Sequence, residues 1–328
     1  MSGQGELDTV IIGGGMAGMA CAVGMVLADR QAVVVEQDIK AGGRMSGLRT
    51  QGYEFDAGAQ YFTVRDPLFR AQVETWLAEQ RVAPWHGWVV EVERGDFFNR
   101  DLTELFVAQP SMGALVRHLA THCDVREGTR IATVARSDGL WRLLDERGEE
   151  QARCGELVLA MPAPQARSLI LAEAPEIAGR IGHFETTACW AVMLGFETAL
   201  PVPFDAAYVS QSPLGWVARN NSKPGRASRE AWVLHATPEW SAVHADLGES
   251  EVLVHLLRAM EKALDLEELD PVFTEVRFWA HAAPIHTLGD PFLRDKTLGL
   301  SLCGDWCLGP RVEAAYLSGH ALSECLAG

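Results

Sequence analysis

The sequence predicts an α/β fold with two interleaved domains, and three observations lead to this prediction. A β-branched run at residues 7–12 ends in a turn rich in glycine. Residues 130–145 hold two alternating segments joined by Ser-Asp-Gly, which is a hairpin signal. Another apolar run, at residues 298–303, ends in Gly-Asp. Because parts of one sheet stand far apart in the sequence, the domain that contains this sheet has to be discontinuous.

The glycine-rich turn lies in the order of elements that binds dinucleotides. A strand is predicted from Leu7 to Ile12, and the next six residues, Gly13 to Gly18, read Gly-Gly-Gly-Met-Ala-Gly. Met19 to Asp29 is apolar or small and lacks proline, which favours a helix buried against a sheet. Gln31 to Glu36 is a second β-branched strand that ends in a carboxylate. Strand, Gly-x-Gly-x-x-Gly, helix, strand and acid form the fingerprint of a Rossmann-type domain.

Each glycine of that fingerprint has its own physical task. Gly13 is predicted to make the tight turn, Gly15 to let a diphosphate approach the backbone, and Gly18 to let the helix pack on the strand. Glu36 is expected to accept hydrogen bonds from ribose hydroxyls and to repel a 2′-phosphate. The bound nucleotide is therefore predicted to be FAD or NAD and not NADP.

The residues after Glu36 favour FAD. Gly42-Gly43-Arg44 follows six residues later, and then Asp56 to Phe62 reads Asp-Ala-Gly-Ala-Gln-Tyr-Phe. Such a Gly-Gly-Arg turn resembles the extended FAD fingerprint of flavoproteins of the amine oxidase and glutathione reductase type. The resemblance implies that Arg44 contacts the diphosphate or the flavin edge; a solvated turn is the alternative.

Two later strands agree with this interpretation. Glu156 to Pro162 predicts a buried strand that closes on small residues, and Leu298 to Cys303 predicts another. The second is followed by Gly304-Asp305 and by a helix from about Val312. In these families the Gly-Asp pair meets the flavin ribitol, and the helix dipole would stabilise a reduced, anionic flavin.

We assign residues 1–75, 106–165 and 285–328 to the FAD-binding domain. Residues 76–105 and 166–284 are expected to form a substrate domain whose mixed sheet covers the flavin.

The composition excludes several classes of protein. A net charge of −16 has the wrong sign for a nucleic-acid binder. Only four of the 28 basic residues are lysines, so a cationic site is expected to use arginine. The seven cysteines lack the spacing of a disulfide framework or a zinc site. His118 and His122 lie four residues apart without a third ligand, so we expect no metal.

One uncharged run, Thr9 to Ala28, is twenty residues long and could on length alone cross a membrane. It contains five glycines and follows acidic residues, unlike the basic start of a signal peptide. We therefore expect a cytoplasmic protein with reduced thiols.

Seven motifs extend the pattern over essentially the whole chain. They are Gly-Gly-Arg-Met (42–45), Asp-Ala-Gly-Ala-Gln-Tyr-Phe-Thr (56–63), Met-Pro-Ala-Pro-Gln (161–165), Trp-Val-Ala-Arg-Asn-Asn-Ser-Lys-Pro-Gly-Arg (216–226), Trp-Val-Leu-His-Ala-Thr (232–237), Cys-Gly-Asp-Trp-Cys (303–307) and Arg-Val-Glu-Ala-Ala-Tyr-Leu-Ser-Gly (311–319). With these motifs the chain resembles the bacterial renalases, within the wider monoamine oxidase-like flavoproteins.

The resemblance implies a non-covalent FAD oxidase that acts on dihydro-NAD(P) isomers, the 1,2-dihydro and also the 1,6-dihydro forms. Such enzymes return NAD(P)⁺ and pass the electrons to O₂, giving hydrogen peroxide, which is metabolite repair. The expected partners are a dinucleotide substrate and O₂, without nucleic acid or membrane, in a monomer or weak dimer. An amine oxidase or desaturase of the same fold and a flavin-binding protein without turnover are the alternatives.

Two departures from the amine oxidase pattern count against amine oxidation. Amine oxidases of this fold place a lysine beside the flavin, yet this chain has none between Lys40 and Lys223. They also place a tyrosine two residues before the glutamate of the C-terminal motif, where this chain has Arg311. An arginine there would repel an ammonium group and attract a phosphate or carboxamide.

The candidate catalytic or substrate-binding residues are Gln60, Tyr61, His235, Trp279 and Arg311. The candidate cofactor contacts are Gly13, Gly15, Met16, Ala17, Gly18, Glu36, Gly43, Arg44, Gly58, Ala59, Gln60, Ile131, Met161, Gly304, Asp305, Arg311, Val312 and Ala315. His235 and Trp279 are also consistent with ordinary core residues.

Four cations cluster in an acidic chain, namely Arg219, Lys223, Arg226 and Arg229. We hypothesise that some of them hold the diphosphate of a dinucleotide substrate; a solvated loop is the alternative.

Overall fold

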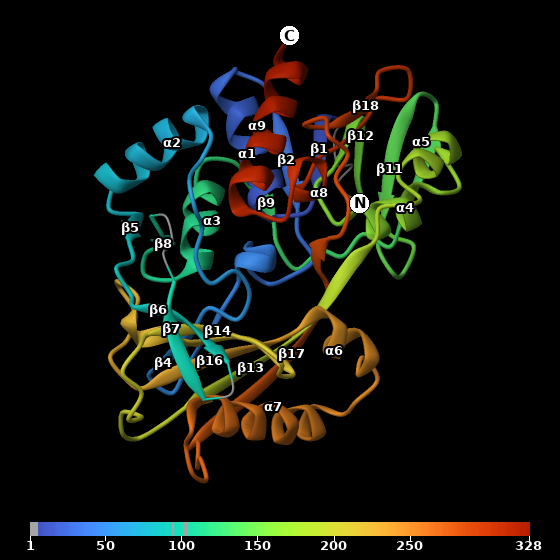
Figure 1. Cartoon of the computed structure of the whole chain (residues 1–328). Coiled ribbons are helices and arrows are strands. Elements are labelled where there is room, and N and C mark those ends of the chain that lie inside the picture. Colours follow the sequence, from blue (N-terminus) through green and yellow to red (C-terminus); the bar gives the residue numbers. More distant parts are fainter. Residues whose placement is uncertain (1–5, 94, 101–103) are drawn as a thin grey trace. The chain divides into compact units, whose positions relative to one another are not determined.

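The computed structural model describes residues 6–93, 95–100 and 104–328, and these form two compact units (Figure 1). Unit 1 consists of Met1–Arg44, Val116–Thr186 and Ala283–Gly328. Unit 2 consists of Met45–Leu115 and Thr187–Ala282. Both units are discontinuous, and each contains its own sheet. The predicted α/β fold is confirmed.

Unit 1 is built on a sheet with a parallel centre, in the order β10-β11-β12-β1-β2-β9, to which β19 and β18 add beside β12. The parallel strands are β1 (Leu7–Ile12), β2 (Ala32–Val35), β9 (Asp124–Arg126), β12 (Glu150–Leu159) and β19 (Leu300–Leu302). The antiparallel ones are β10 (Thr133–Ser137), β11 (Leu140–Leu144) and β18 (Leu293–Asp295). The predicted hairpin is confirmed, since Asp138 and Gly139 both have the positive φ that its turn needs.

Two helices of unit 1 pack unusually close together. α1 (Met16–Leu27) lies beside α9 (Val312–Ala327) in Figure 1. A Cβ on Gly319 would lie 2.0 Å from the carbonyl oxygen of Ala17, so only glycine fits at this position. Unit 1 also contains the short helices α4 (Ala163–Ile170), α5 (Pro175–Arg180) and α8 (Asp305–Leu308), whereas α3 (Met112–Ala120) begins in unit 2 and continues into unit 1. This packing holds the middle of α9 against the first turn of α1, which follows the glycine turn.

Unit 2 is built on a seven-stranded mixed sheet in the order β17-β13-β16-β15-β14-β6-β7. Its strands are β6 (Val89–Glu93), β7 (Asp96–Asn99), β13 (Thr186–Gly195), β14 (Ala206–Val209), β15 (Leu214–Arg219), β16 (Ala231–Ala236) and β17 (Phe273–Pro284). The helix α7 (Glu249–Leu264) covers one face through Val252, Leu256 and Met260. The other face is the one that carries the candidate residues described below.

Smaller elements complete unit 2. They are β3 (Leu48–Thr50), β4 (Tyr53–Phe55), α2 (Pro67–Ala78), β5 (Val82–Pro84), β8 (Phe106–Ala108), η2 (Asn220–Ser222) and α6 (Pro238–Val243), and η1 (Gly43–Met45) spans the boundary between the two units.

The compact units divide the chain at other residues than the expected domains. Residues 45–75 and 106–115 fall in unit 2, and residues 166–186 fall in unit 1. One reason is that β4 packs on Met193 and Val233 of the unit 2 sheet. The segment that follows β4, Asp56 to Phe62, is the one predicted to contact FAD, and it therefore falls in unit 2. Compactness does not test cofactor contact, so the functional domain limits stay a prediction.

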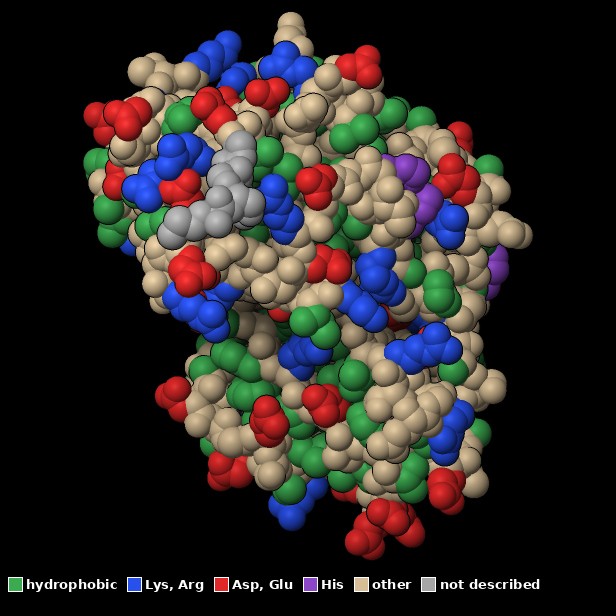
Figure 2. Space-filling view, turned by 180° about the vertical axis from the view of Figure 1, so that it is seen from behind, with side chains coloured by type: hydrophobic (Ala, Val, Ile, Leu, Met, Phe, Trp, Pro, Cys, Tyr) green, Lys and Arg blue, Asp and Glu red, His purple; other side chains and the backbone are tan. Residues whose placement is uncertain are grey.

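The uncharged run from Thr9 to Ala28 is divided among β1, the glycine turn and α1. Among the described residues, no helix has the length and apolar character needed to span a bilayer. Figure 2 shows acidic and basic side chains interspersed over one face of the molecule.

Candidate functional site

The glycine turn of unit 1 fits a dinucleotide diphosphate. Gly13 has a φ of +114°, and a Cβ on it would lie 2.4 Å from the carbonyl oxygen of Ala160. A Cβ on Gly18 would lie 1.9 Å from the carbonyl oxygen of Gly13. By contrast, no heavy atom of the described residues lies within 4 Å of a Cβ on Gly15, which precedes α1 and offers no capping side chain. The backbone is therefore open where an anion would meet the helix N-terminus.

Glu36, the predicted ribose contact, is a buried carboxylate beside the glycine turn. It is 5% exposed, and burial raises the pKa of its carboxyl group. Its two oxygens accept hydrogen bonds from the amide of Gly14, at 2.6 Å, and from the amide of Asp38, at 2.8 Å. Each oxygen keeps a second lone pair for a hydroxyl donor. The glycine turn and Glu36 together fit a dinucleotide cofactor without a 2′-phosphate.

Two further cofactor candidates bind each other. The guanidinium of Arg44 donates two hydrogen bonds to the carboxylate of Asp305, at 2.8 and 2.7 Å. Asp305 also accepts a hydrogen bond from the amide of Trp306 at 3.0 Å. The sequence predicted that both residues contact the cofactor, but it did not predict this pair. Arg44 therefore holds Asp305 in place, which makes it a positioning residue for that carboxylate.

The remaining unit 1 candidates lie in the same region of the fold. A Cβ on Gly43 would lie 3.2 Å from the Cα of Gly15, so the Gly-Gly-Arg turn lies against the glycine turn. The carbonyl of Met161 accepts a hydrogen bond from the indole of Trp306 at 3.1 Å. Ile131 packs on the core of this unit. None of these observations tests a contact with the cofactor itself.

The start of α9 differs from the expectation in one respect. Arg311 precedes the helix, and its guanidinium lies 3.5 Å from the carboxylate of Glu313, whose side chain is 2% exposed. A buried carboxylate in the first turn offsets the positive end of the helix dipole. The sequence predicted that the helix start, with Val312 and Ala315, stabilises an anionic flavin through its dipole. With Glu313 in the first turn, this dipole stabilises an anionic group less than predicted.

In unit 2, polar and aromatic side chains from neighbouring strands lie in one row across the sheet, which we call the cross-strand row. The row consists of Glu91, Tyr208, Trp216, His235 and Ala191, which are paired in register from β6 through β14, β15 and β16 to β13. Paired residues point to the same face of a sheet. Their neighbours along each strand pack with α7, so the cross-strand row lies on the opposite face.

An irregularity in β15 brings Trp216 into this row. Leu214 pairs with Ala236, whereas Trp216, two residues on, pairs with His235 only one residue back. Gly215 is therefore the extra residue of a β-bulge. Leu214 packs with α7, and the bulge turns Trp216 to the other face.

The segment Ala57 to Tyr61 crosses this row and is bound to it at several points. The carbonyl of Ala57 accepts hydrogen bonds from Nε2 of His235 at 3.0 Å and from the indole of Trp279 at 3.1 Å. Tyr61 and Tyr208 share a hydrogen bond between their hydroxyl groups. The structure thus brings together the four candidates of unit 2, Gln60, Tyr61, His235 and Trp279, with Gly58 and Ala59 in the crossing segment.

The protonation of His235 follows from its partner. A carbonyl can only accept, so Nε2 carries the proton and Nδ1 keeps a lone pair. Burial lowers the pKa of His235 to about 4, despite the opposing effect of the Ala57 hydrogen bond. The lowered pKa favours the neutral imidazole near pH 7, and its Nδ1 offers a hydrogen-bond acceptor on the row.

Gln60 is fixed by a buried ionic network. Its Oε1 accepts from Nζ of Lys223 at 3.0 Å and from the indole of Trp216 at 3.4 Å. Its amide nitrogen donates to the carbonyls of Asp56 and Gly58. These contacts use both donors and both acceptor positions of the side chain. Gln60 therefore holds the crossing segment and has no donor left for a substrate or flavin.

Asp56 is the centre of this network. Its carboxylate accepts from Lys223 at 3.2 Å, from Arg226 at 2.7 Å and from the amide of Met112 at 2.9 Å. Burial raises the pKa of Asp56, but the two cations outweigh burial and the net pKa is lowered. Burial also lowers the pKa of Lys223, to about 8.

The hypothesis that the basic cluster binds a substrate diphosphate is wrong for its central members. The side chains of Lys223 and Arg226 are completely buried against Asp56. Arg219 is bound to Glu230 at 3.1 Å, and Arg229 stacks at 4.2 Å from the ring centre of Tyr53. The charge pattern could not reveal this, because the buried carboxylate lies far away in the sequence.

The fold brings one lysine close to a candidate residue. No lysine lies between Lys40 and Lys223 in the sequence, yet the fold brings Lys223 to 3.0 Å from Gln60. Its ammonium group has three N–H donors, and Asp56, Gln60 and Asn220 take them. Lys223 is thus a structural cation.

Sequence reasoning missed an aromatic cluster at one end of the row. The ring of Trp216 lies 5.7 Å from that of Tyr61 and 4.8 Å from that of Tyr208. The guanidinium of Arg100 lies 4.2 Å from the centre of the Tyr208 ring. Strand alternation alone could have placed Tyr208 and Trp216 on a sheet, but not together.

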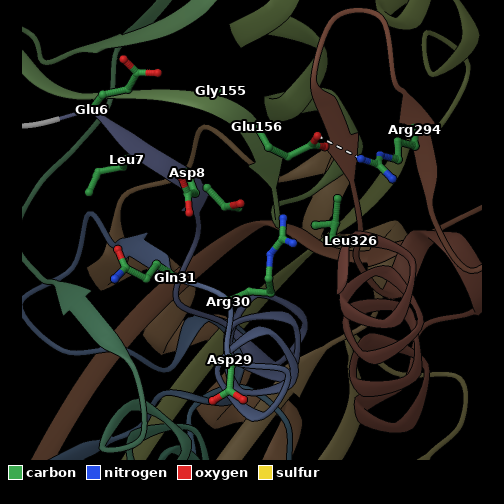
Figure 3. Close-up of a pocket in the computed structure, with 11 residues that line it drawn as sticks. Glu6, Leu7, Asp8, Asp29, Arg30, Gln31, Gly155, Glu156, Arg294 and Leu326 are labelled. Atoms are coloured by element: carbon green, nitrogen blue, oxygen red, sulfur yellow. Dashed lines mark hydrogen bonds and ion pairs between the residues drawn. The ribbon is translucent and has the colours of Figure 1, made fainter. Parts of the chain in front are cut away.

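A separate polar cavity of about 640 Å³ lies in unit 1 (Figure 3). Leu7 and Thr9 at the start of β1, Glu156 of β12 and Arg294 line it. Arg294 and Glu156 form an ion pair at 3.1 Å, drawn as the dashed line. Since the glycine turn follows the other end of β1, this cavity is not the cofactor site. Within the described part of the chain, no three metal-ligating side chains gather.

Two family models match this chain. The NAD(P)-binding Rossmann-like domain matches residues 11–74. The flavin containing amine oxidoreductase model matches residues 75–327.

Solved structures with the same fold cover almost the whole chain. One is a protein of Exiguobacterium sp. 255-15 provisionally assigned as a protoporphyrinogen oxidase, with a TM-score of 0.79 and 13% identity over 99% of both chains. Another is cyclohexylamine oxidase of Brevibacterium oxydans IH-35A, with a TM-score of 0.74 and 12% identity over 98% of this chain and 99% of that one. At these identities the likeness shows the fold alone.

The curated relatives match over a short stretch. All-trans-retinol 13,14-reductase of Danio rerio is 39% identical over 56 residues, which are 17% of this chain and 9% of the reductase. The match thus spans less than a tenth of that relative.

Proposed function

Given that the chain belongs to the flavin-containing amine oxidoreductase family, we propose that it is a renalase-type oxidase of isomeric dihydro-NAD(P). Its substrates are the 1,2-dihydro form and also the 1,6-dihydro form. A dihydronicotinamide, a proton and O₂ give NAD(P)⁺ and hydrogen peroxide. The reaction returns a misreduced nucleotide to the usable pool.

The family implies FAD, and the residues of unit 1 fit it. Gly13, Gly15 and Gly18 would hold the diphosphate, and Glu36 would hold the adenosine ribose. FAD, when bound without a covalent link, supplies the acceptor for a hydride and passes the electrons to O₂.

One observation carries the substrate assignment: around His235 the cross-strand row offers aromatic surface and a neutral acceptor, and its carboxylate, Glu91, stands three strands away on β6. His235 is neutral near pH 7, and the amide of Gln60 is fully bonded. A dihydronicotinamide needs no general base, because its ring nitrogen lone pair expels the hydride. The task of the protein is to hold the donor carbon in place.

Two side chains would do this work. Nδ1 of His235 would accept a hydrogen bond from the carboxamide of the substrate. Trp279, fixed through its indole by the carbonyl of Ala57, would provide a flat wall for the ring.

The alternatives are an amine oxidase or desaturase of the same fold, and a flavin-binding protein without turnover. An ammonium substrate would need to lose a proton before oxidation, and the row provides no charged acceptor for it apart from the distant Glu91. Arg311, which is 37% exposed at its side chain, adds a positive charge at the C-terminal motif.

The test is anaerobic mixing of the FAD-loaded protein with each dihydro-NAD(P) isomer and with a panel of amines, while flavin absorbance is followed. We expect rapid bleaching by the 1,2-dihydro or 1,6-dihydro isomer and none by amines. Bleaching by an amine alone would refute the proposal. Absence of bleaching by every compound would favour a flavin-binding protein without turnover.

A further inference from the structure

The aromatic cluster at the far end of the cross-strand row has features of a binding site that the oxidation itself does not use. We call Tyr61, Trp85, Tyr208 and Trp216, with Arg100, the Tyr208 cluster. Trp85 and Trp216 form its floor and are 3% and 6% exposed, while Tyr61 and Tyr208 are partly exposed. The ring of Tyr61 lies 6.3 Å from that of Trp85. The exposed side of the cluster therefore consists of two phenol rings and a guanidinium.

The polar groups of the Tyr208 cluster are incompletely used. Two hydroxyl groups that share one hydrogen bond retain one O–H donor for a further partner. The indole N–H of Trp85 is buried and has no acceptor among the described residues. A buried donor without an acceptor costs free energy, so it is expected to mark a place where a ligand or water binds.

Arg100 is held only weakly in its present position. Its ion pair with Glu91 has a length of 3.4 Å, and the two side chains are 40% and 47% exposed. A pair so exposed contributes little to stability. A phosphate could therefore recruit Arg100 at low cost, because the guanidinium binds phosphate through two parallel hydrogen bonds.

The spacing of the row selects the length of the ligand. Tyr208 and His235 stand on β14 and β16, two strands apart, which is ~10 Å at ~4.8 Å per strand. A ligand with a ring beside His235 reaches Tyr208 only if it has a second ring system on a connecting chain. A dinucleotide has this form, whereas a mononucleotide or a simple amine does not.

We propose that the Tyr208 cluster binds the second base of the dinucleotide substrate, the adenine that is not oxidised, and that Arg100 binds its phosphate. The inference rests on the proposed function, since the latter puts the dihydronicotinamide beside His235. The cluster then acts as a specificity site that distinguishes dinucleotides from shorter nicotinamide compounds.

The experiment compares two substrates in two variants and a control. Arg100→Ala and Tyr208→Phe are assayed with 1,2-dihydro-NAD and with 1,2-dihydro-nicotinamide mononucleotide. Arg70→Ala is the matched control. Arg70 forms an ion pair with Glu104 at 3.3 Å, and both side chains are exposed, as in the pair of Arg100 and Glu91. We expect KM for the dinucleotide to rise about tenfold in Arg100→Ala, the value of one lost charge-assisted contact, with kcat unchanged. KM for the mononucleotide should stay the same in every variant.

An equal rise of KM for both substrates, or no rise for the dinucleotide, would overturn the inference. If wild-type protein oxidises neither compound, the proposed function fails, and binding decides the inference by itself. Tryptophan fluorescence is then titrated with adenosine monophosphate and with nicotinamide mononucleotide. Quenching by adenosine monophosphate that weakens in Arg100→Ala supports the adenine site. Quenching by nicotinamide mononucleotide alone, or by neither, overturns it.

Discussion

Removal of the Arg44 guanidinium should reveal whether this residue acts through Asp305 or binds the cofactor as a charge. The Asp305 side chain is 9% exposed, and loss of Arg44 would leave it with the amide of Trp306 as its donor among the described residues. Breaking a fully buried ion pair costs ~3–5 kcal/mol, and the 31% exposure of Arg44 lowers this to ~2–4 kcal/mol. We expect Arg44→Ala to be destabilised by that amount.

The assay is a double-mutant cycle of Arg44→Ala and Asp305→Ala. Urea unfolding is followed by tryptophan fluorescence, to which Trp306 contributes next to the pair. Because each substitution removes the same two hydrogen bonds, the single effects should not add, and we expect a coupling energy of ~1.5–3 kcal/mol. A coupling energy below ~0.5 kcal/mol would refute the positioning role.

A second variant separates the two roles of Arg44. Arg44→Lys keeps the charge but loses the paired geometry with Asp305. If Arg44 positions Asp305, the dissociation constant for FAD should rise in Arg44→Lys almost as far as in Arg44→Ala. Full rescue by lysine would instead favour direct contact with the diphosphate.

Three further predictions concern single side chains. Gly18→Ala should lower Tm and abolish FAD binding, because its Cβ would lie 1.9 Å from a carbonyl oxygen; Gly179→Ala, which has open space, should leave both unchanged. Asp56→Asn should cost ~3–5 kcal/mol in urea unfolding, because it leaves two buried cations without a carboxylate, whereas Glu91→Gln should cost less than ~0.5 kcal/mol; similar costs would contradict the network. His235, with its pKa lowered to about 4, binds fewer protons in the folded than in the unfolded state between pH 4 and the ordinary value of 6.5, so its contribution to stability should fall on acidification through this window. The imidazole signals of His235, assigned in NMR by loss in His235→Gln, should not titrate between pH 5.5 and 8, and a titration of these signals near 6.5 would show the lowered pKa to be wrong.

The local parts of the fold could be predicted from the sequence because their signals are local. The glycine turn at Gly13 to Gly18 and the hairpin turn at Asp138-Gly139 each depend on backbone conformations that few residues adopt. The helix after Gly15 and the strand before Glu36 follow from composition and periodicity over a few turns. Both element type and position were therefore predictable.

The partners of the candidate residues could not be predicted, because they depend on distant segments. Arg44 binds Asp305, 261 residues away, and Lys223 binds Asp56, 167 residues away. A run of cations looks like a binding surface until the carboxylate that buries it is known. Glu313 is likewise buried in the first turn of α9, and the sequence pattern predicted the helix dipole there but not this counter-charge.

The bulge at Gly215 makes the composition of the substrate face depend on the number of residues in β15. Leu214 packs with α7, and regular two-residue alternation after it would point Trp216 toward α7 and put the aliphatic Val217 in the row. The extra residue shifts the alternation by one, so an indole stands beside His235 where an isopropyl group would otherwise lie. Deletion of Gly215 would leave Trp216 directly after Leu214 and so keep the indole in the row. Selectivity for flat ring compounds on this sheet therefore depends on residue count as much as on residue type.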